Sequence, residues 1–150
     1  MLFRTHVVFA LASYFLLSYF VEMPIYVLGF VLLGAVFVDV DIRNSRFGNR
    51  WYFRLLQFFT RHRGMFHSLF FAVLISLIIG MINRWFGFGL FVGYVSHLFL
   101  DVFTLEGVRL FWPFNWKVKG FVKSGGIVEQ VVFVLLLLGN ICFVAWLVFY

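Results

Sequence analysis

Five long apolar runs occupy most of this 150-residue chain and restrict what it can fold into. They cover residues 7–21, 24–38, 65–82, 86–103 and 127–150. A helix needs about 20 apolar residues, within a range of about 17–25, to cross the hydrocarbon core of a bilayer. The last three runs reach this length, whereas the first two are short. Because a backbone in lipid must satisfy its own hydrogen bonds, each run predicts a helix.

The composition agrees with a membrane protein. Apolar residues make up 64% of the chain, charged residues 12%, and the mean hydropathy is +1.03. Soluble domains average about 45–50% apolar and about 25% charged residues. We therefore predict an all-α fold, an integral membrane helical bundle of about five transmembrane helices that forms one domain over residues 1–150. Glu22 and Pro24 lie between the first two runs and predict a tight hairpin there, since proline has no N–H to satisfy.

The basic residues predict the orientation. If all five runs span the membrane, every Lys and Arg except Arg84 lies on one side of it. Basic residues favour the cytoplasmic side, so we predict a multi-pass protein of the inner (cytoplasmic) membrane with its N-terminus in the cytoplasm. The basic residues that give the chain its net charge of +6 would then face lipid headgroups. We therefore expect the lipid bilayer as the partner, and no nucleic acid. The sequence names no protein partner.

Two segments between the apolar runs have a mixed aromatic and basic character. In "NRWYFRLLQFFTR", residues 49–61, the polar positions recur at steps of four, three and four, which predicts an interfacial amphipathic helix. Residues 109–126 carry Trp112 and Trp116 and are broken by Pro113 and glycines. We expect this second segment to be a partial lid over the cytoplasmic end, anchored at the interface by its tryptophans.

Most of the histidines and acidic residues fall at one end of the predicted bundle. Only Glu22 and Glu106 lie elsewhere. The residues that gather at the cytoplasmic end are His6, Asp39, Asp41, His62, His67, His97, Asp101 and Glu129. Ionisable groups inside membrane segments are expensive and mark functional sites, so this sorting predicts a polar site at that membrane edge.

The spacing of these residues suits a metal ion. His97 and Asp101 are four residues apart on one helix face, so one ion can contact both. Gly64 allows His62 to lie in a loop that turns back towards His67. Asp39 and Asp41 directly follow the second apolar run, so both carboxylates can reach one site. Imidazole nitrogens with carboxylate oxygens suit Zn²⁺, Mn²⁺ or Fe²⁺ better than Ca²⁺. We predict one or two divalent ions, most simply zinc or manganese, with ligands among His6, Asp41, His62, His67, His97 and Asp101.

Simpler interpretations exist for several of these residues. His6 alone fits an interfacial histidine, and Glu129 fits a carboxylate that the positive end of a helix stabilises without any metal. Asp39 and Asp41 fit helix capping or ion pairs with nearby arginines. His97 and Asp101 also fit a hydrogen-bonded structural pair.

The ordered elements "DVDIRNS", "HRGMFHS", "GYVSHLFLD" and "GGIVEQ" resemble the membrane-bound metal-dependent hydrolase family, which is the YdjM-like family of small inner-membrane proteins described as LexA-binding hydrolases. The resemblance runs from His6 to Glu129 and implies a metal site built from the same polar cluster. A more distant similarity is to the zinc-dependent phospholipase C group. That group follows its His-x-x-x-Asp pair with a His-x-x-x-Glu element, and in this chain Gly125 stands in place of the histidine of that element, four residues before Glu129, so a complete three-metal site is not expected.

These observations lead to a metal-dependent hydrolase acting at the cytoplasmic interface, on a phospholipid or another phosphorylated amphiphile. Asp39 or Glu129 would accept a proton. An arginine near the cluster, Arg63 or one of Arg43 and Arg46, would stabilise charge on the phosphate. Two alternatives remain. One is an ion or proton transporter, which would need polar groups continuing to the other face. The other is a structural or partner-binding protein whose metal only holds the helices together.

Overall fold

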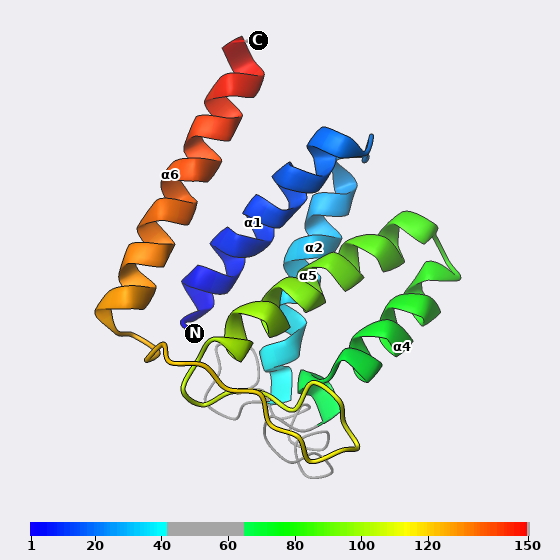
Figure 1. Cartoon of the computed structure of the whole chain (residues 1–150). Coiled ribbons are helices and arrows are strands. Elements are labelled where there is room, and N and C mark those ends of the chain that lie inside the picture. The colour runs from blue at the N-terminus through cyan, green and yellow to red at the C-terminus, as the bar shows by residue number, and fades with distance from the viewer. Residues whose placement is uncertain (42–64, 150) are drawn as a thin grey trace.

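The computed structural model describes residues 1–41 and 65–149, and for residues 40 and 41 the backbone alone. The described chain is helical. Its helices are α1 (Phe3–Phe20), α2 (Tyr26–Phe37), α4 (Leu69–Gly80), α5 (Arg84–Val102) and α6 (Ile127–Phe149), with short 3-10 turns η1 (Val38–Asp41) and η2 (Met65–His67). This confirms the predicted all-α membrane bundle (Figure 1). The amphipathic helix predicted for residues 49–61 lies outside the described residues.

Three of the helices are long and apolar enough to cross a membrane: α1 with 18 residues, α5 with 19 and α6 with 23. The first apolar run is longer than its sequence suggested, because α1 begins at Phe3 and includes Arg4 and His6. The run at residues 65–82 is instead divided. Ser68 adopts an extended backbone, accepts a hydrogen bond from the Phe71 amide and so caps α4, which leaves a helix of only 12 residues.

Helix α5 lies at the centre of the bundle and contacts α1, α2 and α4 (Figure 1). Glycines permit its closest contact. A Cβ on Gly93 would lie 1.8 Å from the Val31 carbonyl oxygen of α2, and one on Gly34 would lie 2.3 Å from the Leu90 carbonyl oxygen. Since lipid tails are as apolar as side chains, membrane helices associate through such close backbone packing. The Gly89-x-x-x-Gly93 pair therefore sets the distance between α2 and α5.

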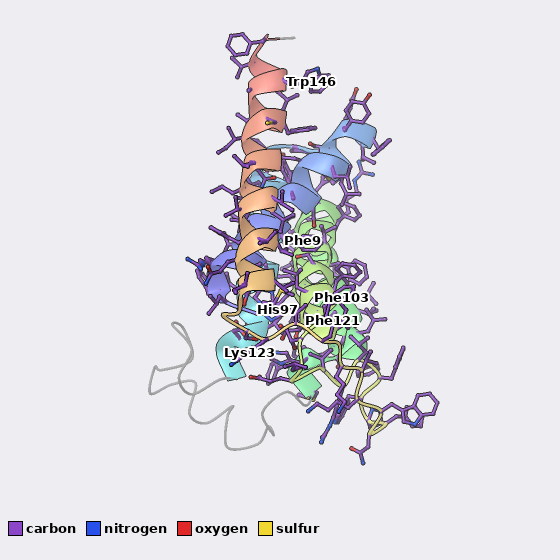
Figure 2. All side chains as sticks on the ribbon, turned by 60° about the vertical axis from the view of Figure 1, so that its left-hand side comes forward. Phe9, His97, Phe103, Phe121, Lys123 and Trp146 are labelled. Carbon is purple, nitrogen blue, oxygen red and sulfur yellow. The ribbon has the colours of Figure 1, made fainter. Side chains whose placement is uncertain are left out.

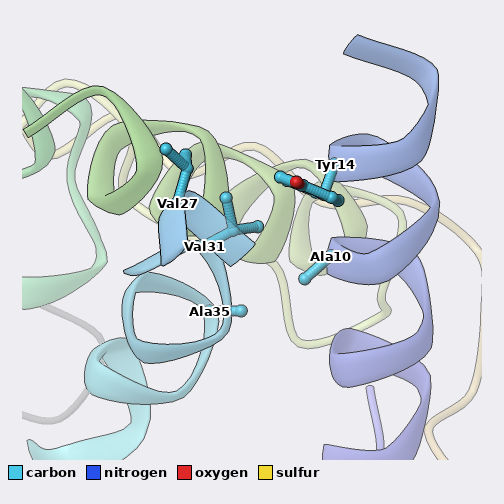
Figure 3. Close-up of a cluster of buried hydrophobic side chains, with 5 residues drawn as sticks. All are labelled: Ala10, Tyr14, Val27, Val31 and Ala35. Carbon is cyan, nitrogen blue, oxygen red and sulfur yellow. The ribbon is translucent and has the colours of Figure 1, made fainter. Parts of the chain in front are cut away.

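The predicted hairpin is present. The backbone of Val21 is extended after α1, and α2 starts at Tyr26 after a short turn that contains Pro24. Figure 3 shows the apolar core that joins these two helices beside α5. Its buried members are Ala10, Tyr14, Val27, Val31 and Ala35.

The remaining parts of the chain frame this core. Helix α6 packs mainly along α1, where the Asn140 side-chain amide donates to the Val8 carbonyl oxygen at 2.9 Å. Residues 103–126 run across the end of the bundle that holds the N-terminus (Figure 1). Isolated β-bridges join Thr104 to Val122 and Val108 to Val118. The predicted lid therefore has a compact base, while Trp116 at its tip is 75% exposed.

Candidate metal centre

Polar side chains from five helical elements meet at one end of the bundle. They belong to the start of α1, η1, η2, the second half of α5 and the start of α6, and are His6, Asp39, His67, His97, Asp101 and Glu129. His67 and His97 are fully buried, and His6 and Asp101 are each 2% exposed. The prediction that these residues share one end of the bundle is correct. Figure 2 labels His97 near this end of the bundle, together with Phe103, Phe121 and Lys123 from the same end of the chain's fold.

The orientation of His97 is decided by the backbone of α2. Its Nδ1 lies 2.6 Å from the Ala35 carbonyl oxygen. A carbonyl only accepts, so Nδ1 carries the proton and, in the neutral ring, Nε2 carries a lone pair. Nε2 is buried and has no hydrogen-bond partner among the described residues. This is the arrangement of a metal-ligating histidine, whose second ring nitrogen is held by a carbonyl or carboxylate.

Two imidazole nitrogens and two carboxylate oxygens lie near one another beside His97. The Nε2 atom of His97 lies 3.6 Å from Asp39 Oδ1 and 3.7 Å from Asp101 Oδ2. The Nε2 atom of His67 lies 3.8 Å from the same Asp39 oxygen and 3.9 Å from the same Asp101 oxygen. Ligands of a tetrahedral zinc ion stand about 3.4 Å apart, given bond lengths of about 2.0–2.1 Å. Ligand atoms of Asp39, His67 and His97 all lie within 4.8 Å of one another and could share one ion, while Asp101 Oδ2 lies near both nitrogens but outside that group.

The second oxygen of Asp101 serves a different set of groups. Its Oδ1 atom lies 2.8 Å from the main-chain nitrogen of Met1 and 3.4 Å from Nε2 of His6. The His6 ring stacks on the His97 ring, with centroids 3.8 Å apart and planes 8° from parallel. His6, His97 and Asp101 also form a group of possible metal ligands. Because Nε2 of His97 has one lone pair, it can bind an ion in this group or in the group with Asp39 and His67, but not in both at once.

Glu129 lies beside the cluster, and its carboxylate already accepts hydrogen bonds from groups outside it. It accepts hydrogen bonds from the Thr5 hydroxyl at 2.8 Å, from the Gly125 amide at 2.6 Å and from the Leu2 amide. Its side chain is 1% exposed. Glu129 thus joins the start of α6 to the start of α1, which carries His6.

Three predicted site residues cannot be placed in this way. His62 and Arg63 lie outside the described residues, and only the backbone of Asp41, the last residue of η1, is described. The structure adds groups that the sequence analysis did not identify as part of the site. Besides the Met1 nitrogen, the Tyr94 hydroxyl donates to the Phe66 carbonyl oxygen and so holds η2, which carries His67, against α5. Tyr94 precedes His97 by three residues on α5, a spacing that could have indicated its proximity.

The comparison with known proteins agrees with this architecture. The model of the family described as YdjM inner membrane protein matches residues 1–149. The protein YvsG of Bacillus subtilis is 26% identical over 154 residues, which cover 98% of this chain and 96% of YvsG. The inner membrane protein YdjM of Escherichia coli is 32% identical over 97 residues, which cover 59% of this chain and 50% of that relative. No solved structure matches the chain.

Proposed function

This chain belongs to the YdjM inner membrane protein family, and from its polar cluster we propose that it is a metal-dependent membrane hydrolase with its active site at one membrane edge. A single observation carries the proposal. The Nδ1 atom of His97 is held by the Ala35 carbonyl, while the buried Nε2 atom is directed at two carboxylate oxygens without hydrogen-bonding either. Such a nitrogen is costly in a folded protein unless a cation binds it.

Four residues would hold the ion: His67, His97, Asp39 and Asp101. This set of two nitrogens and two oxygens suits zinc or manganese. When bound, such an ion supplies Lewis-acid stabilisation of a phosphoryl oxygen and makes a water molecule more acidic. Asp39, which the sequence suggested as a proton acceptor, takes a ligand position in this proposal.

Proton transfer is then assigned to His6. Its Nε2 atom faces Asp101 Oδ1, and its Nδ1 atom has no hydrogen-bond partner among the described residues. With the proton on Nε2, the lone pair on Nδ1 accepts a proton from the attacking water. Asp101 orients His6 through one oxygen while the other faces the ligand set. Glu129 acts as a positioning residue, because its hydrogen bonds fix the segment that carries His6.

The substrate class follows from the surroundings of the site. The cluster lies at the ends of membrane helices, where a phospholipid or another phosphorylated amphiphile presents its phosphate. Lys117, Lys119 and Lys123 belong to the segment that crosses this end and are exposed. Arg63 precedes η2, and we propose that it stabilises charge on the phosphate, as arginine does for many phosphoryl groups.

The test combines metal content with turnover. We expect the purified protein to contain close to one zinc or manganese ion per chain and to hydrolyse a phosphoester amphiphile. The variants His97→Ala and Asp101→Asn should lose both properties while still inserting into the membrane. Glu22→Gln, which neutralises an exposed carboxylate outside the cluster, should keep both. A wild-type protein without metal, or full turnover in Asp101→Asn, would refute the proposal.

One observation favours a second candidate, a purely structural metal site. His67 and His97 have no exposed surface, so a substrate reaches the ion only if neighbouring groups move. A structural site predicts that removing the metal unfolds the bundle and that no phosphoester is hydrolysed. Circular dichroism after chelation, together with the substrate screen, separates the two functions.

A further inference from the structure

A groove between α4 and α5 is lined by no residue of the polar cluster. It encloses about 550 Å³, a volume typical of small-molecule sites. Its walls are almost entirely apolar and include Val73, Leu77, Phe88 and Phe91. Arg84 lies at its end, 13 residues before His97 on α5, which places it about 20 Å away along the helix axis. The groove is therefore separate from the candidate metal centre.

Arg84 gives this apolar groove a positive end. Its side chain is exposed, and its guanidinium carbon lies 5.4 Å from the centroid of the Trp85 ring. It forms no ion pair with a side chain in the parts of the chain that the structure describes. The amide groups of the first turn of α5 add positive potential at the same place. An anionic group is the complement of this surface.

Ser76 supplies a second polar group that lines the groove. Its hydroxyl oxygen is buried and finds no hydrogen-bond partner among the described residues, and the residue is 7% exposed. Ser76 lies four residues before the end of α4 at Gly80, which is about 6 Å deeper along the helix. A hydroxyl at this depth suits an ester oxygen below a phosphate headgroup. Buried hydroxyls are normally hydrogen-bonded, so a missing partner points to a bound group.

We propose that this groove binds one anionic glycerophospholipid. The phosphate lies at Arg84, an ester carbonyl accepts a hydrogen bond from Ser76, and an acyl chain follows the apolar walls towards Val73. Another apolar helix would cover the walls equally well, but it would leave both Arg84 and Ser76 without partners. Arg84 is also the one basic residue predicted for the outer face, so the lipid would belong to that leaflet.

Fluorescence of Trp85 tests the headgroup preference, because its ring lies beside Arg84. Replacing Trp51, Trp112, Trp116 and Trp146 with phenylalanine leaves Trp85 as the only tryptophan. This variant is reconstituted in vesicles that contain phosphatidylglycerol or phosphatidylcholine with brominated acyl chains. We expect phosphatidylglycerol to occupy the site with about fivefold preference, as one arginine near a headgroup confers. Arg84→Gln should abolish the preference.

Arg4→Gln provides the matched control, because Arg4 lies at the opposite end of the bundle, 4.8 Å above the Phe133 ring. It should leave the preference at Trp85 unchanged. Equal quenching by the two lipids in the Arg84-containing protein would overturn the proposal. Native mass spectrometry of the otherwise unchanged protein gives an independent measurement. One retained phosphatidylglycerol, lost in Arg84→Gln and released more easily in Ser76→Ala, supports the site, whereas equal retention in all three proteins overturns it.

Discussion

Replacing Gly93 with alanine should disturb the metal centre although Gly93 contacts none of its ligands. The added Cβ would lie 1.8 Å from the Val31 carbonyl oxygen and 2.9 Å from the Ala35 amide nitrogen. A carbon and a carbonyl oxygen approach only to about 3.3 Å, so the facing backbones must separate by about 1.5 Å. The affected stretch of α2 includes Ala35, whose carbonyl holds His97 at 2.6 Å.

A separation of this size takes that hydrogen bond beyond its normal range of about 2.7–3.2 Å. His97 then loses the group that fixes its tautomer and ring orientation. Losing such a supporting partner weakens metal binding by about 10–100-fold. The crowded backbone should also lower the free energy of unfolding by about 1–3 kcal/mol.

The assay is a competition titration of the purified protein with a calibrated zinc chelator, together with thermal unfolding in detergent. Gly29→Ala is the matched control, because Gly29 lies on α2, the helix that faces Gly93, and a Cβ there meets no atom within 4 Å. It should leave zinc affinity unchanged. If Gly93→Ala binds zinc as tightly as the wild-type protein, the proposed link from helix packing through Ala35 to His97 is wrong.

Three further predictions concern other contacts. Glu129→Gln should lower the free energy of unfolding by about 1–3 kcal/mol, because each carboxylate oxygen accepts from a backbone N–H and the new NH2 group must face one of these donors. Glu22→Gln should leave the free energy of unfolding unchanged, and equal midpoints of the two variants in a denaturant titration would contradict this. Ser68→Ala removes the cap of α4 and should cost about 1 kcal/mol in the same titration, more than Ser18→Ala, whose hydroxyl only donates to the Phe15 carbonyl oxygen in the last turn of α1. In a Cys142→Ala background, Met81→Cys should react with an impermeant thiol reagent on intact cells and Lys117→Cys should not; the reverse pattern would place the N-terminus outside.

Much of the architecture could be predicted from hydrophobic length alone. A lipid-exposed backbone has no alternative to helix, so each apolar run forms one, and a short polar break between runs forces a reversal of direction. That alternation brings Asp39, His67 and His97 to the same end of the bundle before any contact is known. The helix period likewise places Asp101 beside His97. These conclusions depend only on periodicity and on the order of the runs.

The boundaries of individual helices were harder to predict from the sequence, because a capping residue can start or end a helix inside a continuous apolar run. Ser68 is a small polar residue inside an apolar run, and its hydrogen bonds to Met65 and Phe71 end one helical turn and begin another. Hydropathy averaged over the run does not detect this. At the other extreme, α1 extends back through Arg4 and His6, since a long basic side chain near a helix end can reach the interface.

The chemistry within the cluster was decided by tertiary structure. The sequence predicted that His97 lies at this end of the bundle. Only the close approach of Gly93 to Val31 brings the Ala35 carbonyl to the His97 ring, which leaves Nε2 directed at the carboxylates. Main-chain groups carry no sequence signature, so the partner at Ala35 could not be foreseen. The same reason applies to Glu129, which the sequence grouped with the catalytic residues and which the fold engages with two backbone amides and Thr5. Residue type and order determined which groups reach this end of the bundle, and backbone packing determined what each of them can do there.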